Sequence, residues 1–251
     1  MPAQRRPIYR DLSHPIEAGM TTFPGDPTVA VSPAATVDTD GFSVHELCCG
    51  THTGTHIDAP SHTEPDGDDV NDRDVGEYVF EARLVDVAPC TPREAIGPDR
   101  LPERIDEAVD LVVIRTGWDA SWNTEEYLNH PYLTADAARR LRDAGCGVGV
   151  DALNPDPTPV DNTDAPGGEA GSNTPGGETD SDTSGSGTDD EPNGFPVHHV
   201  LLGDNLPIIE NLTGLGGLPK RFTLYAFPLP VVDGDGAPVR AVAAVQSDEL
   251  P

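Results

Sequence analysis

The segment from His52 to His62 most constrains how this chain folds, because it concentrates three histidines and one aspartate in eleven residues. His52, His56, Asp58 and His62 all have even numbers. Side chains of an extended strand alternate between its two faces, so on a strand all four would point the same way. A helix would bring His52 beside His56 but carry Asp58 far round its surface. The glycine, threonines and proline of the segment also disfavour a helix. The pattern therefore predicts an extended strand with one face of ligand-type side chains.

A one-sided cluster of neutral imidazoles and a carboxylate is typical of a site for a divalent metal ion such as zinc or manganese. The spacing differs from the helical H-E-x-x-H motif and from that of a zinc finger. A single histidine is more often a structural or surface residue. Three histidines with an aspartate, at spacings of four, two and four, favour a metal site instead.

The charge of the chain excludes several classes of partner. The formal net charge is −29, from 44 acidic and 15 basic residues, and Lys220 is the only lysine. Such a surface repels nucleic acid and anionic membranes. An acidic, lysine-poor composition suits concentrated salt, where screening suppresses self-repulsion, so we expect a protein of a salt-rich cytoplasm, as in halophilic archaea. The alternative is an ordinary acidic protein whose charge is inflated by one acidic tract.

The location and the redox compartment follow from what the chain lacks. Residues 1–10 have no apolar core of a secretory signal, and no run approaches the length of a membrane span. The four cysteines suggest no disulfide framework. We therefore expect a soluble, cytoplasmic protein.

The pattern of elements predicts a single α/β domain over residues 1–251 with a mixed sheet. The expected strands and the expected helix over 134–144, with Thr134 as its N-cap, alternate along the chain. Residues from about 155 to 194 are rich in Asp, Glu, Gly, Ser, Thr and Pro and contain no lysine or arginine. This tract is predicted to be a disordered insertion, because it cannot bury enough apolar surface to offset its ordering entropy. The strands are expected at 78–88, 109–115, 147–151, 206–209, 223–228 and 239–245.

Two further residues are candidates to complete the metal site. Pro196 predicts a short helix that carries His198 and ends at Gly203. An apolar strand then delivers Glu210 at its end, where a carboxylate is costly unless it is paired or binds a metal ion. The alternatives are a surface histidine at the start of a helix and an exposed strand end. Phe23, Trp118 and Trp122 are candidates to line a pocket for an aromatic substrate, with core packing as the alternative for each.

The chain resembles the cyclase family of metal-dependent hydrolases, which includes bacterial kynurenine formamidase and isatin hydrolase. The segment 52–62 matches the family signature H-x-G-T-H-x-D-x-P-x-H at every fixed position. The likeness covers nearly the whole chain apart from the acidic tract. Other segments that fit the family are Asp11–Ile16, Phe23–Pro27, Arg115–Trp118, Gly149–Asp151, His198–Leu202, Ile208–Leu212, Pro228–Pro230 and Pro238–Val242.

The resemblance implies a swivelling β/β/α architecture, a homodimer and a role for each candidate. His52, His56 and Asp58 would hold a first metal ion. Asp58 would bridge to a second ion held by His198 and Glu210, whose separation of twelve positions fits the family better than that of His199. His62 would transfer protons rather than bind metal. One or two ions of zinc or manganese are therefore expected.

The resemblance also implies an enzyme. The expected reaction is metal-dependent hydrolysis of an aryl formamide, N-formyl-kynurenine, to kynurenine and formate, a step of tryptophan catabolism. One alternative is hydrolysis of an isatin-type cyclic amide or a lactone by the same chemistry. Another is a metal-containing binding protein without turnover. No G-x-S-x-G motif is present, so a serine hydrolase is not expected.

Overall fold

A computed structural model describes residues 6–159, 192 and 194–246. Its main feature is a nine-stranded mixed sheet in the order β1-β13-β11-β5-β7-β9-β10-β4-β12. The strands from β5 through β7 and β9 to β10 run parallel, and the strands on either side of them pair antiparallel. The predicted α/β class with a mixed sheet is confirmed. The strands of this sheet are β1 (Ile8–Asp11), β4 (His56–Asp58), β5 (Val79–Asp86), β7 (Leu111–Arg115), β9 (Gly147–Val150), β10 (Ile208–Glu210), β11 (Arg221–Tyr225), β12 (Gly236–Pro238) and β13 (Val242–Val245).

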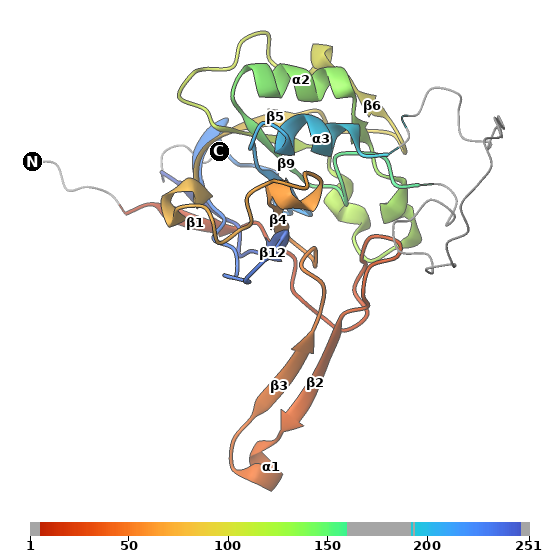
Figure 1. The fold of residues 1–251 in the computed structure, drawn as a ribbon, viewed down its shortest axis with the longest axis vertical. Coiled ribbons are helices and arrows are strands. Elements are labelled where there is room, and N and C mark those ends of the chain that lie inside the picture. Colours follow the sequence, from red (N-terminus) through yellow and green to blue (C-terminus); the bar gives the residue numbers. More distant parts are fainter. Residues whose placement is uncertain (1–5, 160–191, 193, 247–251) are drawn as a thin grey trace, which may run out of the picture.

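Helices α2 and α3 lie over one face of this sheet, whereas α1 lies away from it between β2 and β3 (Figure 1). Thr134 caps α2 through its side chain, which accepts a hydrogen bond from the backbone of Ala137, as the sequence predicted. Pro196 opens α3, and Gly203 follows its last residue. The α-helices are α1 (Val37–Asp40), α2 (Ala135–Asp143) and α3 (Pro196–Leu202). The 3₁₀ turns are η1 (Pro60–His62), η2 (Val75–Tyr78), η3 (Pro98–Arg100), η4 (Trp118–Ser121) and η5 (Glu125–Asn129).

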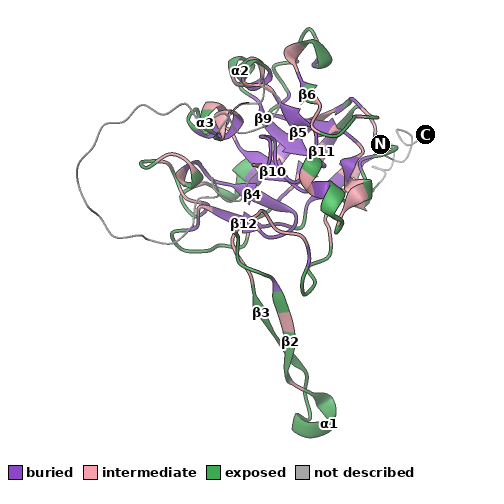
Figure 2. Ribbon diagram, turned by 90° about the vertical axis from the view of Figure 1, so that its right-hand side faces the viewer, coloured by how far each residue is buried: buried purple, intermediate pink, exposed green. Residues whose placement is uncertain are grey.

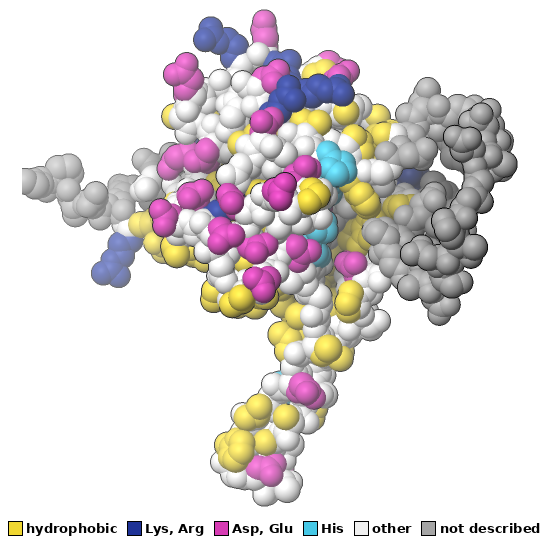
Figure 3. Space-filling view, in the orientation of Figure 1, with side chains coloured by type: hydrophobic (Ala, Val, Ile, Leu, Met, Phe, Trp, Pro, Cys, Tyr) yellow, Lys and Arg dark blue, Asp and Glu magenta, His cyan; other side chains and the backbone are white. Residues whose placement is uncertain are grey.

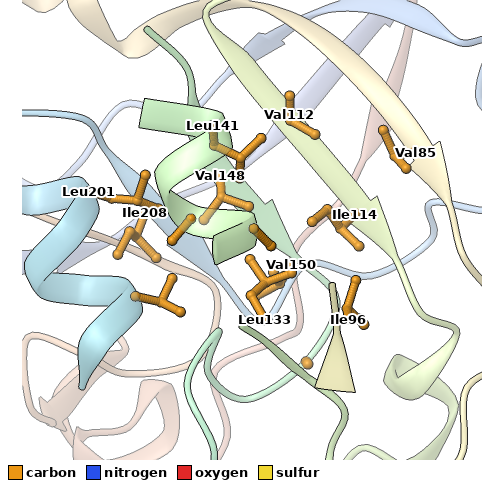
Figure 4. Close-up of a cluster of buried hydrophobic side chains, with 14 of the residues drawn as sticks. Val85, Ile96, Val112, Ile114, Leu133, Leu141, Val148, Val150, Leu201 and Ile208 are labelled. Carbon is orange, nitrogen blue, oxygen red and sulfur yellow. The ribbon is translucent and has the colours of Figure 1, made fainter. Parts of the chain in front are cut away.

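The centre of the sheet is buried on both faces, which explains the continuous apolar run of β7. Leu111, Val112, Val113 and Ile114 are all fully buried, as expected for a parallel strand covered on both sides. Val112 and Ile114 face the helices, where Leu141 of α2 and Leu201 of α3 pack against the sheet (Figure 4). Leu111 and Val113 face a second core cluster on the opposite side of the sheet.

A hairpin projects away from the body of the molecule and was not predicted. It consists of β2 (Ala30–Ala35) and β3 (Val44–Cys48), paired antiparallel, with α1 between them. Most of its residues are exposed along its length (Figure 2). A second small sheet pairs β6 (Ala95–Ile96) with β8 (Tyr132–Leu133).

The predicted start of the disordered insertion, at about residue 155, is too early. Pro155, Asp156 and Thr158 are buried in the body, and Asp156 contacts α3. Their polar, proline-rich composition resembles that of the tract that follows, so the sequence did not separate the two. The prediction of disorder for residues 160–191 and 193 lies outside the described residues. Within the described parts of the chain, no helix combines the length and apolarity that a membrane span requires.

Candidate metal centre

Strand β4 places the first two candidate ligands. His56 and Asp58 point to one face, and Ile57 between them packs into the core. Glu210 of β10 lies directly opposite His56 in the antiparallel register, and Gly236 of β12 lies opposite Asp58. The alternation that the sequence predicted therefore holds over these three residues, and the sheet brings a carboxylate from a neighbouring strand to the same place.

The prediction of one continuous strand from His52 to His62 is wrong at both ends. Gly54 adopts a left-handed conformation with a φ of 61°, so the chain turns between His52 and β4. Pro60 starts η1, and His62 is the last residue of that turn. His52 nevertheless reaches the site, because its Nδ1 lies 2.8 Å from Asp58 Oδ1. Gly236 leaves room for this ring, since a Cβ at that position would lie 2.7 Å from His52 Cε1.

The second half of the site is placed as expected from the sequence. His198 lies on α3 and is buried, and its Nε2 is 3.5 Å from Asp58 Oδ2 and 3.3 Å from Glu210 Oε1. Glu210 is buried rather than exposed, and its Oε2 lies 3.3 Å from His56 Nε2. His199, the neighbour of His198, points to the surface and pairs with Glu64 at 2.9 Å. The predicted ligands from both halves of the chain therefore meet around Asp58.

These buried atoms fit a divalent metal ion. Among the described residues, His56 Nε2, Asp58 Oδ2 and Glu210 Oε1 are buried without an aligned hydrogen-bond partner. Unsatisfied buried polar atoms are rare, because each loses its interaction with water. Ligand atoms about 2.0–2.2 Å from a shared ion lie roughly 3.3 Å apart, close to the separations seen here. Two groups of ligand atoms share Asp58: His52, His56 and Asp58, and Asp58, His198 and Glu210.

Each of the three candidate histidine ligands contacts an acceptor on the side of its ring away from the centre. His56 Nδ1 lies 2.8 Å from the carbonyl oxygen of Gly54. His198 Nδ1 lies 2.7 Å from Asp156 Oδ2, and His52 Nε2 lies 2.9 Å from Asp235 Oδ2. If these nitrogens carry the proton, the other nitrogen of each ring presents a lone pair to the centre. Such outer hydrogen bonds orient metal-binding imidazoles and select their tautomers.

Sequence reasoning missed both of these carboxylates. Asp156 is fully buried and also accepts hydrogen bonds from the backbone of Val197 and His198 at the start of α3. It lies where the composition suggested the start of the disordered tract. Asp235 lies in the sequence Asp233-Gly234-Asp235-Gly236, which is typical of an exposed turn. Neither local pattern carries a signal that the residue contacts a histidine far away in the chain.

The charges of the centre stabilise one another. Burial opposes the charged form of His52, but hydrogen bonds to Asp235 and Asp58 outweigh it and raise the pKa of His52 to about 9. Burial also disfavours the carboxylate of Asp58, yet the nearby His56 and the hydrogen-bonded histidines hold the pKa of Asp58 well below its usual range. Protons and a metal cation therefore compete for the same histidine nitrogens, as at metal sites generally.

A cavity of about 310 Å³ opens onto this centre. Its wall includes Phe23, Phe195 and Leu153, and the rings of Phe23 and Phe195 lie 6.0 Å apart between centroids. His62 also lines the cavity, with its ring 4.0 Å from that of His52. Figure 3 shows histidine side chains reaching the surface of one face among many acidic groups. The cavity thus joins an aromatic wall to a cluster of metal-ligand groups.

The three aromatic residues proposed for substrate binding lie in different places. Phe23 is one of the described residues that line the cavity, whereas Trp118 and Trp122 are not among them. Trp118 is buried in the core and donates a hydrogen bond from Nε1 to the carbonyl oxygen of Tyr127. Trp122 stacks on His14, with ring centroids 3.9 Å apart. Phe195, which sequence reasoning did not select, lies opposite Phe23.

Asp151 follows β9 and holds a turn. It accepts hydrogen bonds from the backbone of Thr116 and Gly117 and from the Thr116 hydroxyl. Burial outweighs these hydrogen bonds and raises the pKa of Asp151 to about 6. These contacts connect the ends of β7 and β9.

Comparison with known proteins identifies the family to which the sequence of this chain is similar. A family model described as a putative cyclase matches residues 10–157. The chain is 32% identical over 235 residues to a kynurenine formamidase from Bacillus cereus, covering 92% of this chain and 95% of the relative. A kynurenine formamidase from Salinibacter ruber is 30% identical over the same coverage, 92% of this chain and 95% of the relative.

Solved structures share the fold at lower sequence identity. Isatin hydrolase A from Ralstonia solanacearum matches with a TM-score of 0.76 and 23% identity, covering 96% of this chain and 92% of that structure. A predicted metal-dependent hydrolase from Bacillus stearothermophilus matches with a TM-score of 0.69 and 23% identity, covering 96% of this chain and 100% of that structure. These matches confirm the predicted cyclase-like fold.

Proposed function

Because this chain belongs to the cyclase family of metal-dependent hydrolases, we propose that its substrate is N-formyl-kynurenine, which it hydrolyses to kynurenine and formate. The chain is an enzyme of hydrolase type, since its relatives are named as hydrolytic enzymes along nearly their whole length. The observation that carries the substrate proposal is the cavity. Its wall contains Phe23 and Phe195, and His62 stands beside the ligand cluster. An aromatic amide fits this combination of groups.

In the proposed mechanism, a bound divalent ion supplies Lewis-acid polarisation of the scissile carbonyl and lowers the pKa of water to about 7. The residues that would hold it are His52, His56, Asp58, His198 and Glu210. His62 accepts the proton of the attacking water, because its Nδ1 is held by Asp235 at 3.2 Å and its Nε2 is left as the basic nitrogen.

The remaining steps balance without another reactant. The oxygen of water forms a bond to the formyl carbon, and the bond from that carbon to the aryl nitrogen breaks. His62 returns its proton to this leaving nitrogen, so formate and a free arylamine leave the site. Phe23 and Phe195 contact the aromatic ring and exclude water from it.

The metal is proposed to be zinc or manganese, and the site to hold one or two ions. Imidazole and carboxylate ligands without thiolate suit either metal. Two groups of ligand atoms that share Asp58 support the presence of one or two ions: His52, His56 and Asp58 would hold one, and Asp58, His198 and Glu210 would hold the other.

A second candidate substrate is an isatin-type cyclic amide or a lactone. It is supported by the similar fold of isatin hydrolase A. At 23% sequence identity, this similarity extends to the fold and not to the substrate specificity. A non-catalytic metal-binding protein is the third reading of the sequence. It is not favoured, because the chain belongs to a family of hydrolases and retains His62 beside the ligands.

The deciding experiment measures formate release from N-formyl-kynurenine in concentrated KCl. The protein is tested as purified, after chelation, and after separate addition of zinc and manganese. We expect activity that chelation abolishes and metal restores. His62→Ala should lower turnover by about 10²–10⁴-fold while metal content stays unchanged. A folded, metal-loaded protein that releases no formate but opens isatin would replace the substrate by the cyclic amide.

We further propose that the enzyme works as a homodimer in a salt-rich cytoplasm. The net charge of −29 supports the salt adaptation, because a halophilic protein needs a strongly solvated acidic surface. The exposed apolar side chains of the hairpin β2–β3 support a second copy of the chain as their partner. These side chains are Val37, Phe42, Val44 and Leu47.

A further inference from the structure

The backbone on either side of Asp235 is fixed next to the metal centre by the edge of the sheet. The carbonyl oxygen of Asp235 accepts a hydrogen bond of 2.9 Å from the backbone of Ala59, just after β4. The next residue, Gly236, pairs with Asp58 in the register of β12 and β4. The side chain of Asp235 is 41% exposed, so it lies at the boundary between the centre and solvent.

The carboxylate of Asp235 accepts hydrogen bonds from three side chains of the segment that carries the metal motif. Oδ2 lies 2.9 Å from His52 Nε2 and 3.2 Å from His62 Nδ1. Oδ1 accepts a hydrogen bond of 2.8 Å from the hydroxyl of Thr51.

One carboxylate oxygen therefore contacts two histidines with different roles. Asp235 accepts from Nε2–H of His52, which leaves Nδ1 of that ring directed at the centre, 2.8 Å from Asp58 Oδ1. With a cation in the centre, Nδ1 would present its lone pair to the cation; without one, Nδ1–H donates to Asp58. When the same oxygen accepts from Nδ1–H of His62, the Nε2 of that ring is left without a proton. For His62 to act as a base through Nε2, its proton must sit on Nδ1, whereas for His52 to bind metal through Nδ1, its proton must sit on Nε2.

His62 depends on Asp235 more than His52 does. His52 contacts Asp58 as well as Asp235, and only 16% of its side chain is exposed. Asp235 supplies the one hydrogen bond found for the His62 ring among the described residues, and 33% of that side chain is exposed. Without Asp235, the His62 ring would be free to rotate and to exchange tautomers.

We propose that Asp235 is a positioning residue that holds His52 and His62 in complementary tautomers, one to bind metal and one to accept a proton. The effect on His62 is the larger of the two, because His52 keeps its second contact. This inference rests on the proposed role of His62 in the reaction.

The test compares Asp235→Asn and Asp235→Glu in the full chain, with Asp233→Asn as the matched control. Asp233 is an exposed acidic residue in the same turn, with a φ of 54° that asparagine tolerates. Three quantities are measured: the histidine tautomers by ¹⁵N NMR, the affinity and stoichiometry of zinc by competition with a chelator, and kcat and KM. Circular dichroism and the melting temperature verify that each variant folds.

For Asp235→Asn we expect His62 to change from one tautomer, with the proton on Nδ1, to a mixture. We expect kcat to fall about 10–100-fold, KM to change little, and zinc affinity to fall less than kcat. Asp235→Glu should recover part of kcat and of the tautomer preference, because it retains a carboxylate. Asp233→Asn should match the wild type in all three.

Three results would overturn the proposal. The first is an unchanged His62 tautomer with kcat within twofold of wild type in Asp235→Asn. The second is an equal loss in Asp233→Asn, which would indicate a general charge effect. The third is loss of one bound zinc ion with the tautomer unchanged, because His52, His62 and Asp235 would then be ligands of that ion. The tautomer and zinc measurements need no substrate. If N-formyl-kynurenine is not the substrate, the wild type itself shows no turnover, and these two measurements still test the role of Asp235.

Discussion

At the scale of single residues, the centre depends on hydrogen bonds behind the ligands as much as on the ligands themselves. His198 is held by Asp156 through a hydrogen bond of 2.7 Å between two buried side chains. The neighbouring His199 makes a similar contact with Glu64, but its side chain is 58% exposed. The two adjacent pairs are both histidine–carboxylate contacts, but only the pair of Asp156 and the candidate ligand His198 is buried.

Asp156→Asn should weaken metal binding about 10–100-fold, because asparagine no longer offers a charged acceptor to His198. The affinity is measured by competition with a chelator on the full chain. Glu64→Gln is the control for the exposed pair and should leave the affinity unchanged. Equal affinities for the wild type and Asp156→Asn would show that Asp156 serves α3 alone, through the backbone hydrogen bonds of Val197 and His198.

His130 makes stability depend on pH, because it is buried in its neutral form. Its Nδ1 lies 2.9 Å from the carbonyl oxygen of Pro131, and its Nε2 lies 2.8 Å from the hydroxyl of Thr158. Burial lowers the pKa of His130 to about 4 from an ordinary value of 6.5. Between these values the unfolded chain binds a proton that the folded chain does not, so the stability falls as pH decreases through this window.

The expected loss from His130 is about 2 kcal/mol between pH 7 and pH 5. Urea denaturation at the two pH values measures it in the wild type and in His130→Gln, which cannot titrate. The variant is expected to be less stable at pH 7 but to lose less stability on acidification. If both proteins lose the same free energy of unfolding, His130 does not set the pH dependence.

At the scale of elements, local pattern and tertiary structure disagree most around β4. The period of two predicted a strand across all four residues of the motif, His52, His56, Asp58 and His62, yet β4 contains only three residues. Gly54 and Pro60 end it on either side, because each imposes a backbone conformation that a strand does not continue. The side chains still converge, since a turn and a 3₁₀ turn carry His52 and His62 back over the same face.

The hairpin β2–β3 is an element that exposes several large apolar side chains to solvent. A two-stranded hairpin is marginally stable alone in water, and this one exposes Val37, Phe42, Val44 and Leu47. It also joins two segments of the site, because Phe23 and Asp26 precede β2 and His52 follows β3. A second copy of the chain that packs against the hairpin would stabilise it and, through it, the entrance to the cavity.

We therefore expect Phe42→Asp to convert a dimer into monomers, because it places a charge in the apolar contact. Sedimentation or light scattering in concentrated KCl measures the mass. Val75→Asp is the matched control, since Val75 is 70% exposed on the body of the molecule, and it should leave the dimer intact. A wild-type protein that is monomeric at the concentrations of the assay would contradict the proposal.

At the scale of the whole molecule, charge decides the conditions under which the fold is stable. A net charge of −29 on 251 residues repels itself in dilute buffer. Salt shortens the range of that repulsion, from about 10 Å at 0.1 M to about 3 Å at 1 M. Few basic residues are present to neutralise the acidic ones, so the repulsion is reduced mainly by dissolved salt.

The melting temperature should rise steadily as the KCl concentration increases from 0.1 M to about 2 M. The rise should continue above about 1 M, where the Debye length is already short. Differential scanning fluorimetry measures it, with sodium sulfate at equal ionic strength as a comparison. A melting temperature that does not change, or that falls, would mean that the acidic composition is not an adaptation to salt.

The sequence by itself determined the α/β class, the capped helix α2 and the strands that are continuous apolar runs, and it selected the candidate ligands His52, His56, Asp58, His198 and Glu210, which the structure brings together. These follow from short-range patterns and from a motif, in which a few residue types at fixed spacing suffice. Only the tertiary structure decided the roles of Asp156 and Asp235, the place of Phe195 opposite Phe23, and the projection of the hairpin. Asp235 acts on His52 across a separation of 183 positions. A contact of that kind exists only once the sheet has set β4 beside β12, so nothing in the local pattern around Asp235 carries it.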